Sequence, residues 1–307
     1  MVTPEDFTPP PELAAALGKR SDGGLPLLEL VVPRREIIED LSVAPASATF
    51  VATRGTAAHL TRIPELRQLQ ALWANPASAE LFEACAQAPA LRAIYVTHFK
   101  RLSDVALSQA PRLEHLMLSW APRLVDLAFL QDLPALRTVY LEDMKRLDLA
   151  TLPELPNVTG FHLGGGMWSP LRVKSLEPLT RLPHLRYLRL SNVRSTDGSL
   201  RPLAQLGELR ELYLPNFFEL EEVARLAGAL PTVASNTLSP VFATFDAGSP
   251  QSAPFQCPDC GGRRDMMTGK PGLLLCSACD ADRYRRRVAR WEVARAGGWS
   301  RSDDTVG

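Results

Sequence analysis

The chain has 307 residues, of which 46% are hydrophobic and 22% are charged, and its 34 basic and 34 acidic side chains leave a formal net charge of zero. This composition is that of a folded protein with a substantial core and excludes an intrinsically disordered chain. The zero net charge excludes long-range attraction of the whole molecule to nucleic acid or to an acidic membrane, so such binding requires a local charged patch.

Residues 1–60 are predicted to form an N-terminal cap over the domain that follows. Short helices are predicted for PELAAALG from Pro11 and REIIEDL from Arg35, and a buried strand for LPLLELVV from Leu25. The first residues carry acids and prolines where a secretory signal has a basic start and an apolar run, and no run of about 18 apolar residues occurs later. We therefore expect a cytoplasmic protein that does not engage a membrane.

A sequence pattern of the form Pro-x-Leu-x-x-Leu-x-Leu recurs through residues 61–238. Its good copies are PALRAIYV from Pro89, PRLEHLML from Pro111, PALRTVYL from Pro134, PNVTGFHL from Pro156, PHLRYLRL from Pro183 and GELRELYL from Gly207, at steps of 22, 23, 22, 27 and 24 residues. The alternating leucines predict a short strand in each copy, with its leucines pointing inward. Between copies, leucines three residues apart, such as Leu176, Leu179 and Leu182, predict tight 3-10 turns.

This pattern resembles the leucine-rich repeat family, in its short class of about 22 residues per unit. The resemblance implies an α/β solenoid of short parallel strands with 3-10 or irregular helical returns. The family usually places asparagine three residues after the last strand leucine, where this chain has Phe99, Ala121, Met144, Gly166, Val193 and Phe217. We therefore expect apolar packing in place of an asparagine ladder.

The resemblance also implies that partners lie against the outward-pointing strand residues of the concave surface. These positions and the residues just after the strands include Tyr95, His98, His115, Trp120, Tyr140, His162, Tyr187, Arg189 and Tyr213. Large rigid aromatic side chains are enriched at interfaces, so we predict a protein-binding face here. A preference of aromatic residues for strands is the alternative explanation. The histidines fall in different repeats, which argues against a metal site among them.

Two closely spaced cysteine pairs follow a stretch rich in Ser, Pro and Ala, residues 239–254, that is predicted to be a linker. The cysteines are Cys257, Cys260, Cys276 and Cys279, with fifteen residues between the pairs. Tight turns place the two thiolates of a C-x-x-C on the same side of the chain, as a tetrahedral metal requires, and TGKPG at 268–272 is expected at the tip of the connecting hairpin.

This segment resembles the zinc ribbon family, and four protein ligands imply a structural Zn²⁺ with no open position for chemistry. A rubredoxin-type iron site and a pair of disulfides are the alternatives that the spacing leaves open.

A helix is predicted from Asp280 to Gly297, with Tyr284, Val288 and Trp291 on one apolar face. Its other faces carry Arg283, Arg286, Arg287 and Arg290, within a stretch from Cys257 to Arg301 that holds ten basic and five acidic residues. Residues 255–297 are thus predicted to be a zinc ribbon with a basic C-terminal helix, and 298–307 a tail. These arginines are candidate nucleic-acid contacts. A solvated face on a helix packed against the ribbon is the simpler interpretation.

No motif in the chain assigns a reaction. Cys85 is expected to be buried on a helix, and Gly164 to Gly166 are expected to shape a loop, since no helix opens after them to bind phosphate. We therefore predict no enzyme, but a protein-protein interaction module that recognises its partner on the concave aromatic face. The alternative is a nucleic-acid-binding protein that uses the ribbon and the arginine-rich helix.

Overall fold

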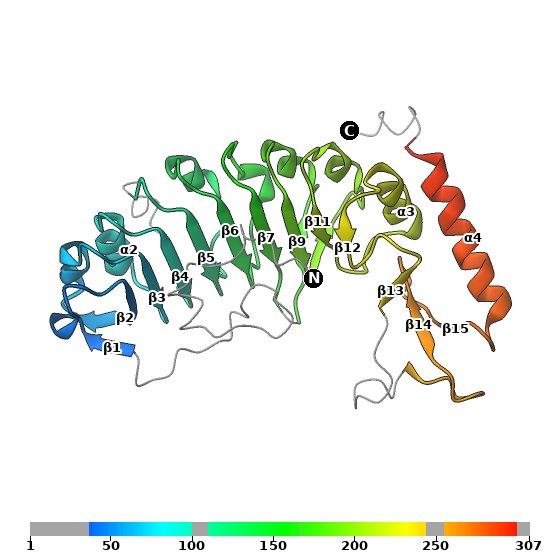
Figure 1. Ribbon diagram of the computed structural model, residues 1–307, viewed down its shortest axis with the longest axis horizontal. Helices are drawn as coiled ribbons and strands as arrows, with labels where there is room; N and C mark the ends of the chain where they lie inside the picture. The colour runs from blue at the N-terminus through cyan, green and yellow to red at the C-terminus, as the bar shows by residue number, and fades with distance from the viewer. Residues whose placement is uncertain (1–36, 100–109, 167, 244–254, 300–307) are drawn as a thin grey trace.

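The computed structural model describes residues 37–99, 110–166, 168–243 and 255–299. Its main body is a parallel sheet in the order β1-β2-β3-β4-β5-β6-β7-β9-β11-β12, with one strand from each turn of the chain (Figure 1). The strands are β1 (Ile37–Asp40), β2 (Phe50–Ala58), β3 (Ala71–Ala74), β4 (Ala93–Thr97), β5 (His115–Ser119), β6 (Thr138–Glu142), β7 (Gly160–Gly164), β9 (Tyr187–Ser191), β11 (Glu211–Tyr213) and β12 (Ala234–Ser235). This is the architecture of a leucine-rich repeat solenoid, as the repeat predicted.

The returns between strands are mostly 3-10 helices. They are η3 (Leu41–Val43), η4 (Leu60–Glu65), η5 (Ala128–Asp132), η6 (Leu149–Thr151), η7 (Glu177–Arg181) and η8 (Arg201–Gln205), while α2 (Ala79–Ala86) and α3 (Leu220–Ala229) are α-helical. The leucines spaced by three lie in these turns, as predicted, because three residues per turn place them all toward the core. The long repeat after β7 adds β8 (Leu171–Val173), which pairs in parallel with β10 (Val193–Ser195).

The prediction of a helix from Arg35 is wrong for the residues of that segment that the structure describes. Ile37 to Asp40 form strand β1, with Ile37 opposite Ala52 of β2, so pairing with a neighbouring strand overrides a weak local helix pattern. The sheet therefore begins inside the range predicted as the cap. The predicted helix at 11–18 and strand at 25–32 lie outside the described residues.

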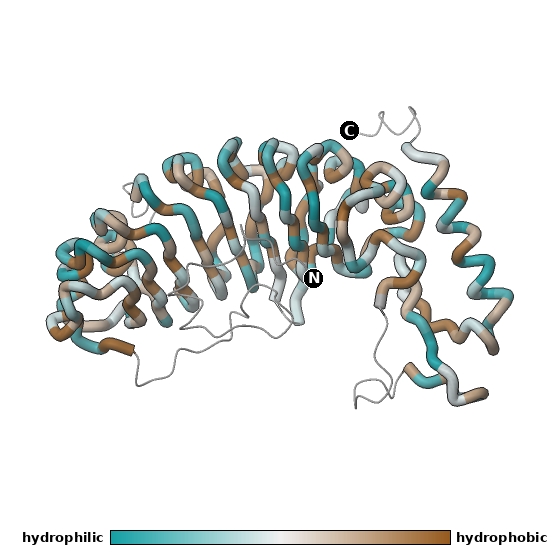
Figure 2. Tube along the Cα trace, in the orientation of Figure 1, coloured by the Kyte–Doolittle hydropathy of each residue, from teal (hydrophilic) through white to brown (hydrophobic). Residues whose placement is uncertain are grey.

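The core between sheet and returns is built from the repeat leucines, which Figure 2 shows as hydrophobic segments recurring in successive turns. The positions without asparagine pack there, since Phe99, Ala121, Met144 and Val193 are buried. Cys85 is also buried in α2, and burial raises the pKa of its thiol to about 12. The predicted apolar packing is therefore confirmed at these four positions, and so is the packing role of Cys85. Phe217 differs, because its ring is half-buried and lies under the guanidinium of Arg194.

A second apolar cluster lies on the other face of the sheet, which we call the concave face. It contains Ala52, Ala71, Trp73, Ala93, Tyr95, Met117 and Tyr140, with Ile37, Phe50 and Tyr187 packed against it. The strands in this part of the sheet are therefore apolar on both sides. Near-continuous apolar strand sequences are typical of sheets buried on both faces.

The cysteine segment folds into a three-stranded antiparallel sheet of β13 (Val241–Ala243), β14 (Arg264–Met267) and β15 (Leu274–Cys276), followed by α4 (Ala281–Gly297). The predicted hairpin tip therefore joins β14 to β15 as expected, and the helix has its predicted bounds to within one residue. Strand β13 lies inside the range predicted as a linker.

Helix α4 packs against α3 at the C-terminal end of the solenoid (Figure 1). Trp291 of α4 is 1% exposed and belongs to the same core as the repeat leucines. Gly228 of α3 permits this contact, because a Cβ there would lie 2.3 Å from the carbonyl oxygen of Arg295. The ribbon and α4 thus cover the last turn of the solenoid, the place where a repeat array needs a cap.

Candidate functional site

The parallel register brings the predicted concave residues into two rows. One row runs Trp73, Tyr95, Met117, Tyr140, His162, Arg189 and Tyr213, and the other includes His115 and Tyr187. Neighbours in a row come from adjacent strands, so their side chains lie beside one another. The strand residues that the repeat pattern placed on one surface therefore lie side by side on one face of the sheet.

Exposure divides this group into two parts. Tyr95, Tyr140 and His162 are buried, whereas Trp120 is 41% and Tyr213 38% exposed, and His98 is also exposed. His115, Tyr187 and Arg189 are half-buried. An incoming partner can contact Trp120, His98 and Tyr213 directly, whereas the buried members form part of the protein's own packing.

The residues that follow the strands form what we call the turn edge: His98, Trp120, Asp143 and Asn192. All four have positive φ angles, of 52°, 52°, 55° and 51°. The turns after β4, β5, β6 and β9 therefore leave the sheet through one left-handed residue, a conformation that suits Asn and Asp and disfavours a bulky side chain. Trp120 is the outlier, and its ring stands edge-on to that of His98 with centroids 3.8 Å apart.

Two neighbouring carboxylates lie where β6 meets this edge. Glu142 accepts a short hydrogen bond from Nε2 of His162 and another from Oγ of Ser191 at 3.2 Å, while the His162 ring stacks on Tyr140 with centroids 3.9 Å apart. Burial lowers the pKa of His162 despite the nearby carboxylate. The ring is therefore neutral near pH 7, with its proton on Nε2.

Gly164, the last residue of β7, has a role that the sequence did not reveal. A Cβ on Gly164 would lie 1.9 Å from Oε2 of Glu142, so only glycine leaves room for this carboxylate. Gly166 is similarly close to Asp143. The loop prediction for Gly164 to Gly166 missed this contact because it depends on residues one repeat earlier.

Asp143 is the second carboxylate of the pair. Its Oδ1 atom is buried and has no hydrogen-bond partner among the described residues. Burial raises the pKa of Asp143 and lowers that of His98, although the charge of each group acts on the other in the opposite sense. The turn edge thus combines an exposed aromatic ring, an imidazole and a carboxylate oxygen that no described residue bonds.

The four ribbon cysteines meet at one point. Their sulfur atoms all lie within 4.8 Å of one another, and Sγ of Cys260 is 3.7 Å from Sγ of Cys276. Tetrahedral zinc with bonds of about 2.3 Å separates its sulfur ligands by about 3.8 Å. Backbone N–H groups of Gly262 and Cys279 point at the sulfurs of Cys260 and Cys276. The donor set therefore fits a tetrahedral metal ion.

The four thiols also influence one another's protonation. Backbone hydrogen bonds from Cys279 and Ala278 lower the pKa of Cys276 to about 7, whereas hydrogen bonding to the sulfurs of Cys260 and Cys257 raises the pKa of Cys279. Four thiolates this close repel one another. A divalent cation at their centre removes that repulsion, because metal binding deprotonates a coordinating thiol.

The predicted nucleic-acid arginines have separate environments. Arg287 is buried, and its Nη2 donates to the carbonyl oxygens of Thr268 and Gly269 at 2.9 and 3.0 Å. Arg290 forms a short ion pair with Glu221 of α3. Arg283 lies 3.6 Å from Asp280, and Arg286 is exposed. Two of the four arginines thus hold α4 on the ribbon and on the solenoid.

Within the described ranges, the helices are too short or too polar to span a lipid bilayer.

No protein-family model matches the chain, and no curated protein matches it. Solved structures similar to it include a leucine-rich repeat protein of Leptospira interrogans (15% identity, TM-score 0.46, 57% of this chain and 50% of the other) and internalin C2 of Listeria monocytogenes (18%, 0.38, 67% and 76%). The mouse RP105/MD-1 complex also matches (16% identity, TM-score 0.43, 58% of this chain). This chain spans half the length of the Leptospira protein and 36% of the mouse one. Its own strand order and returns identify the chain as a leucine-rich repeat solenoid.

Proposed function

We propose that the chain is a protein-interaction module whose partner docks on the concave side at the turn edge, around Trp120, His98 and Asp143. The observation that carries this proposal is the exposure and backbone conformation of Trp120. An indole that is 41% exposed is held at φ 52°, where a side chain of this size costs roughly 1–2 kcal/mol. Strain of this kind concentrates at binding sites, and tryptophan is the residue most enriched at interface hot spots.

Tyr213 and the half-buried Arg189 extend the proposed contact surface along the same face, with the Arg189 guanidinium 5.5 Å from the centre of the Tyr213 ring. Tyr95, Tyr140 and His162 lie on the same face of the sheet but are buried. Replacing Tyr140 is therefore expected to lower stability, since it removes a buried ring stacked on His162.

Trp120→Asn tests this proposal better than alanine, because asparagine accepts the left-handed backbone that alanine resists. Val43→Asn is the control, since Val43 is 74% exposed in η3, near the start of the solenoid and away from the turn edge. Each variant and the parent are used as bait with cross-linking, and captured proteins are quantified by mass spectrometry. We expect at least one protein to be lost with Trp120→Asn and retained with Val43→Asn. Equal capture by all three baits would contradict the proposal.

We further propose that Cys257, Cys260, Cys276 and Cys279 hold a structural Zn²⁺ that keeps the ribbon and α4 folded as the C-terminal cap. Four sulfur ligands leave no site for water or substrate, so the metal supplies cross-linking and no chemistry. Elemental analysis of untagged protein should give one zinc per chain, and iron at that stoichiometry would overturn the assignment.

Nucleic-acid binding by the arginine helix is the weaker candidate. Arg287 and Arg290 are engaged within the protein, which leaves Arg283 and Arg286 for phosphate contact. Changing Arg283 and Arg286 together to glutamine should leave retention on a heparin column unchanged if this helix serves only as part of the cap. A steep, salt-dependent loss of retention would support the nucleic-acid alternative.

A further inference from the structure

The apolar cluster on the concave face is buried, although the described residues that form it belong to a single layer. Its members and the hydrophobic residues packed against it all lie in strands β1 to β6 and β9 of one sheet. Nevertheless Trp73 is 2% and Tyr95 0% exposed, whereas Tyr213 of the same row is 38% exposed. Side chains stand away from a sheet, so their outer ends stay in water unless a second layer packs on them. The burial of Trp73 and Tyr95 therefore requires a second layer over this part of the sheet.

Two polar atoms in the cluster indicate what this layer offers. Nε1 of Trp73 and the hydroxyl of Tyr95 are buried and have no hydrogen-bond partner among the described residues. Buried polar groups are nearly always hydrogen-bonded. The covering layer is therefore expected to present hydrogen-bond acceptors beside its apolar side chains, as the backbone carbonyls of an extended segment do.

Residues 1–36 are the part of the chain outside the described ranges that is attached beside this cluster. They join β1 at Ile37, which packs against the cluster. The stretch 100–109 instead joins Phe99 to Ala110, and both of these belong to the main core on the other face of the sheet. The stretches that follow β13 and α4 are attached to the ribbon and the cap. The N-terminal segment is therefore the best placed of these to cover the concave cluster.

Residues 25–32, LPLLELVV, match this cluster in polarity and in length. Glu29 is their only charged member, and residues 33–36 connect them to Ile37. Eight extended residues span about 26 Å, and the four spacings from β2 to β6 span about 19 Å. A run of this length that starts beside β1 can therefore cross all five strands of the buried part of the face.

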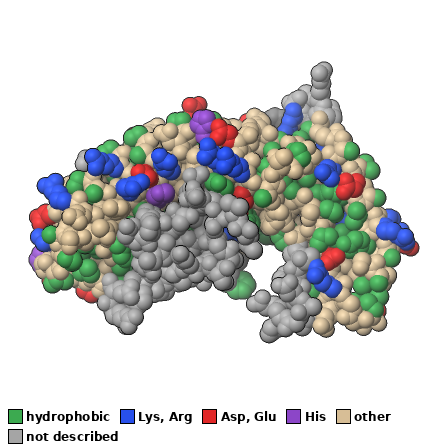
Figure 3. Space-filling model, viewed as in Figure 1, with side chains coloured by type: hydrophobic (Ala, Val, Ile, Leu, Met, Phe, Trp, Pro, Cys, Tyr) green, Lys and Arg blue, Asp and Glu red, His purple; other side chains and the backbone are tan. Residues whose placement is uncertain are grey.

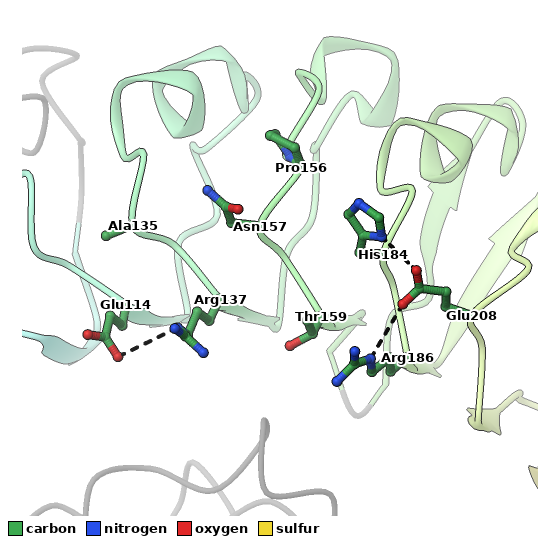
Figure 4. A pocket seen from close by; sticks show the side chains of 9 residues that line it. All are labelled: Glu114, Ala135, Arg137, Pro156, Asn157, Thr159, His184, Arg186 and Glu208. Carbon is green, nitrogen blue, oxygen red and sulfur yellow. Dashed lines mark hydrogen bonds and ion pairs between the residues drawn. The ribbon is translucent and has the colours of Figure 1, made fainter.

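Other described parts of the solenoid surface suit an apolar segment less well. Charged side chains of both signs recur over the solenoid surface that Figure 3 shows. At the entry to the strands a hollow is lined by ion pairs, with Arg137 3.9 Å from Glu114 and Arg186 3.5 Å from Glu208 (Figure 4). Covering charged groups with apolar side chains carries a desolvation cost. The concave cluster carries no such cost, since its lining is apolar.

We propose that residues 25–32 lie across the apolar rows of β2 to β6 and shield the concave face of their own chain there. With the segment in place, a partner reaches Tyr213 and the turn edge at Trp120 but does not reach Trp73 or Tyr95. A partner that binds the shielded rows must first displace the segment, which makes it an autoinhibitory contact. The proposal is independent of the partner surface at Trp120, because it concerns residues that are buried.

The test uses two methionines on opposite faces of the sheet. Met117 is 3% exposed in the concave cluster, and Met144 is 0% exposed in the main core. The oxidation of each by a pulse of hydroxyl radicals is measured by mass spectrometry, in the parent and in a full-length chain whose residues 25–32 are replaced by a Gly-Ser sequence of equal length. We expect the replacement to raise the oxidation rate of Met117 about tenfold or more, because burial limits reaction to transient opening, and to leave Met144 protected.

Replacement of residues 11–18 by the same Gly-Ser sequence is the matched control and should leave Met117 protected. Three results would overturn the proposal: Met117 freely oxidised in the parent, Met117 still protected without the 25–32 sequence, or an equal rise in the 11–18 control. Protection of Met117 that is lost when the parent is diluted would also overturn it, because a second copy of the chain would then be the cover.

A second measurement decides the case in which Met144 also becomes reactive and the replaced chain has unfolded. Leu28 is exchanged for photoreactive p-benzoylphenylalanine in an otherwise unchanged chain, and the cross-links are mapped by mass spectrometry. We expect cross-links within one chain to peptides that contain Tyr95 or Met117. Cross-links confined to other parts of the chain, or formed between two chains, would refute the proposed position of the segment.

Discussion

Trp291 of α4 connects the cap to the repeat array. It is 1% exposed and lies in the same core as the repeat leucines, more than 60 residues beyond α3 in the chain. Truncating a fully buried tryptophan to alanine removes its burial and leaves a cavity, at a cost of about 3–5 kcal/mol. That is a large fraction of the 5–15 kcal/mol by which a typical domain is stable. We therefore expect Trp291→Ala to lower the free energy of unfolding by about 3 kcal/mol or more.

Urea unfolding followed by far-ultraviolet circular dichroism measures this effect, since the solenoid and α4 both contribute to the signal. Val293→Ala is the matched control, because Val293 lies two residues along the same helix and is 75% exposed, so its loss should change stability by less than about 0.5 kcal/mol. A loss below about 1 kcal/mol for Trp291→Ala would refute the inference that α4 completes the solenoid core. An unfolding curve with a separate transition at low urea, and an unchanged main transition, would also refute this inference.

Three further results are expected. Cys276→Ser should abolish stoichiometric zinc and lower the thermal midpoint of the whole chain, because Arg287 and Trp291 depend on the ribbon for their position; an unchanged midpoint would mean that the cap folds without metal. Gly164→Ala should cost about 1–3 kcal/mol in a denaturation experiment by displacing the carboxylate of Glu142, whereas Gly207→Ala, with open space around it, should not destabilise. The unfolded chain binds a proton at His162 near pH 6.5 while burial keeps the folded ring neutral, so stability should fall as the pH drops below about 6.5, by at most about 1.4 kcal/mol per pH unit from this group. The slope of unfolding free energy against pH should be shallower for His162→Gln, and an identical slope would contradict this.

The repeat and the cysteine spacing are local patterns, and for that reason they were predictable. A leucine at every second position of a strand and at every third position of a return fixes which side of the chain is apolar, whatever the neighbouring turns contain. The same holds for the hairpin between the cysteine pairs and for the helix that follows it. The rows of the concave face follow in turn, because successive repeats stack in register.

The candidate site was only partly predictable. Its aromatic members were found from their strand positions, but exposure separates Trp120 from Tyr95, and exposure depends on packing across several strands. The left-handed backbone of Trp120 was not predicted, because tryptophan itself does not favour it; the signal lay in Asp143 and Asn192, which occupy the equivalent position of other repeats. The contact between Gly164 and Glu142 was missed because it depends on residues from separate repeats.

By itself, the sequence determined the solenoid, its register and the four-sulfur cluster, since each follows from residue spacing within one repeat or one hairpin. Only the tertiary structure decided that the ribbon and α4 close the solenoid, through Trp291, Arg290 and Glu221. It also decided which outward residues remain accessible. Both outcomes depend on surfaces that meet after the local elements have formed, and the free energy of such contacts is set by shape and burial between distant segments of the chain.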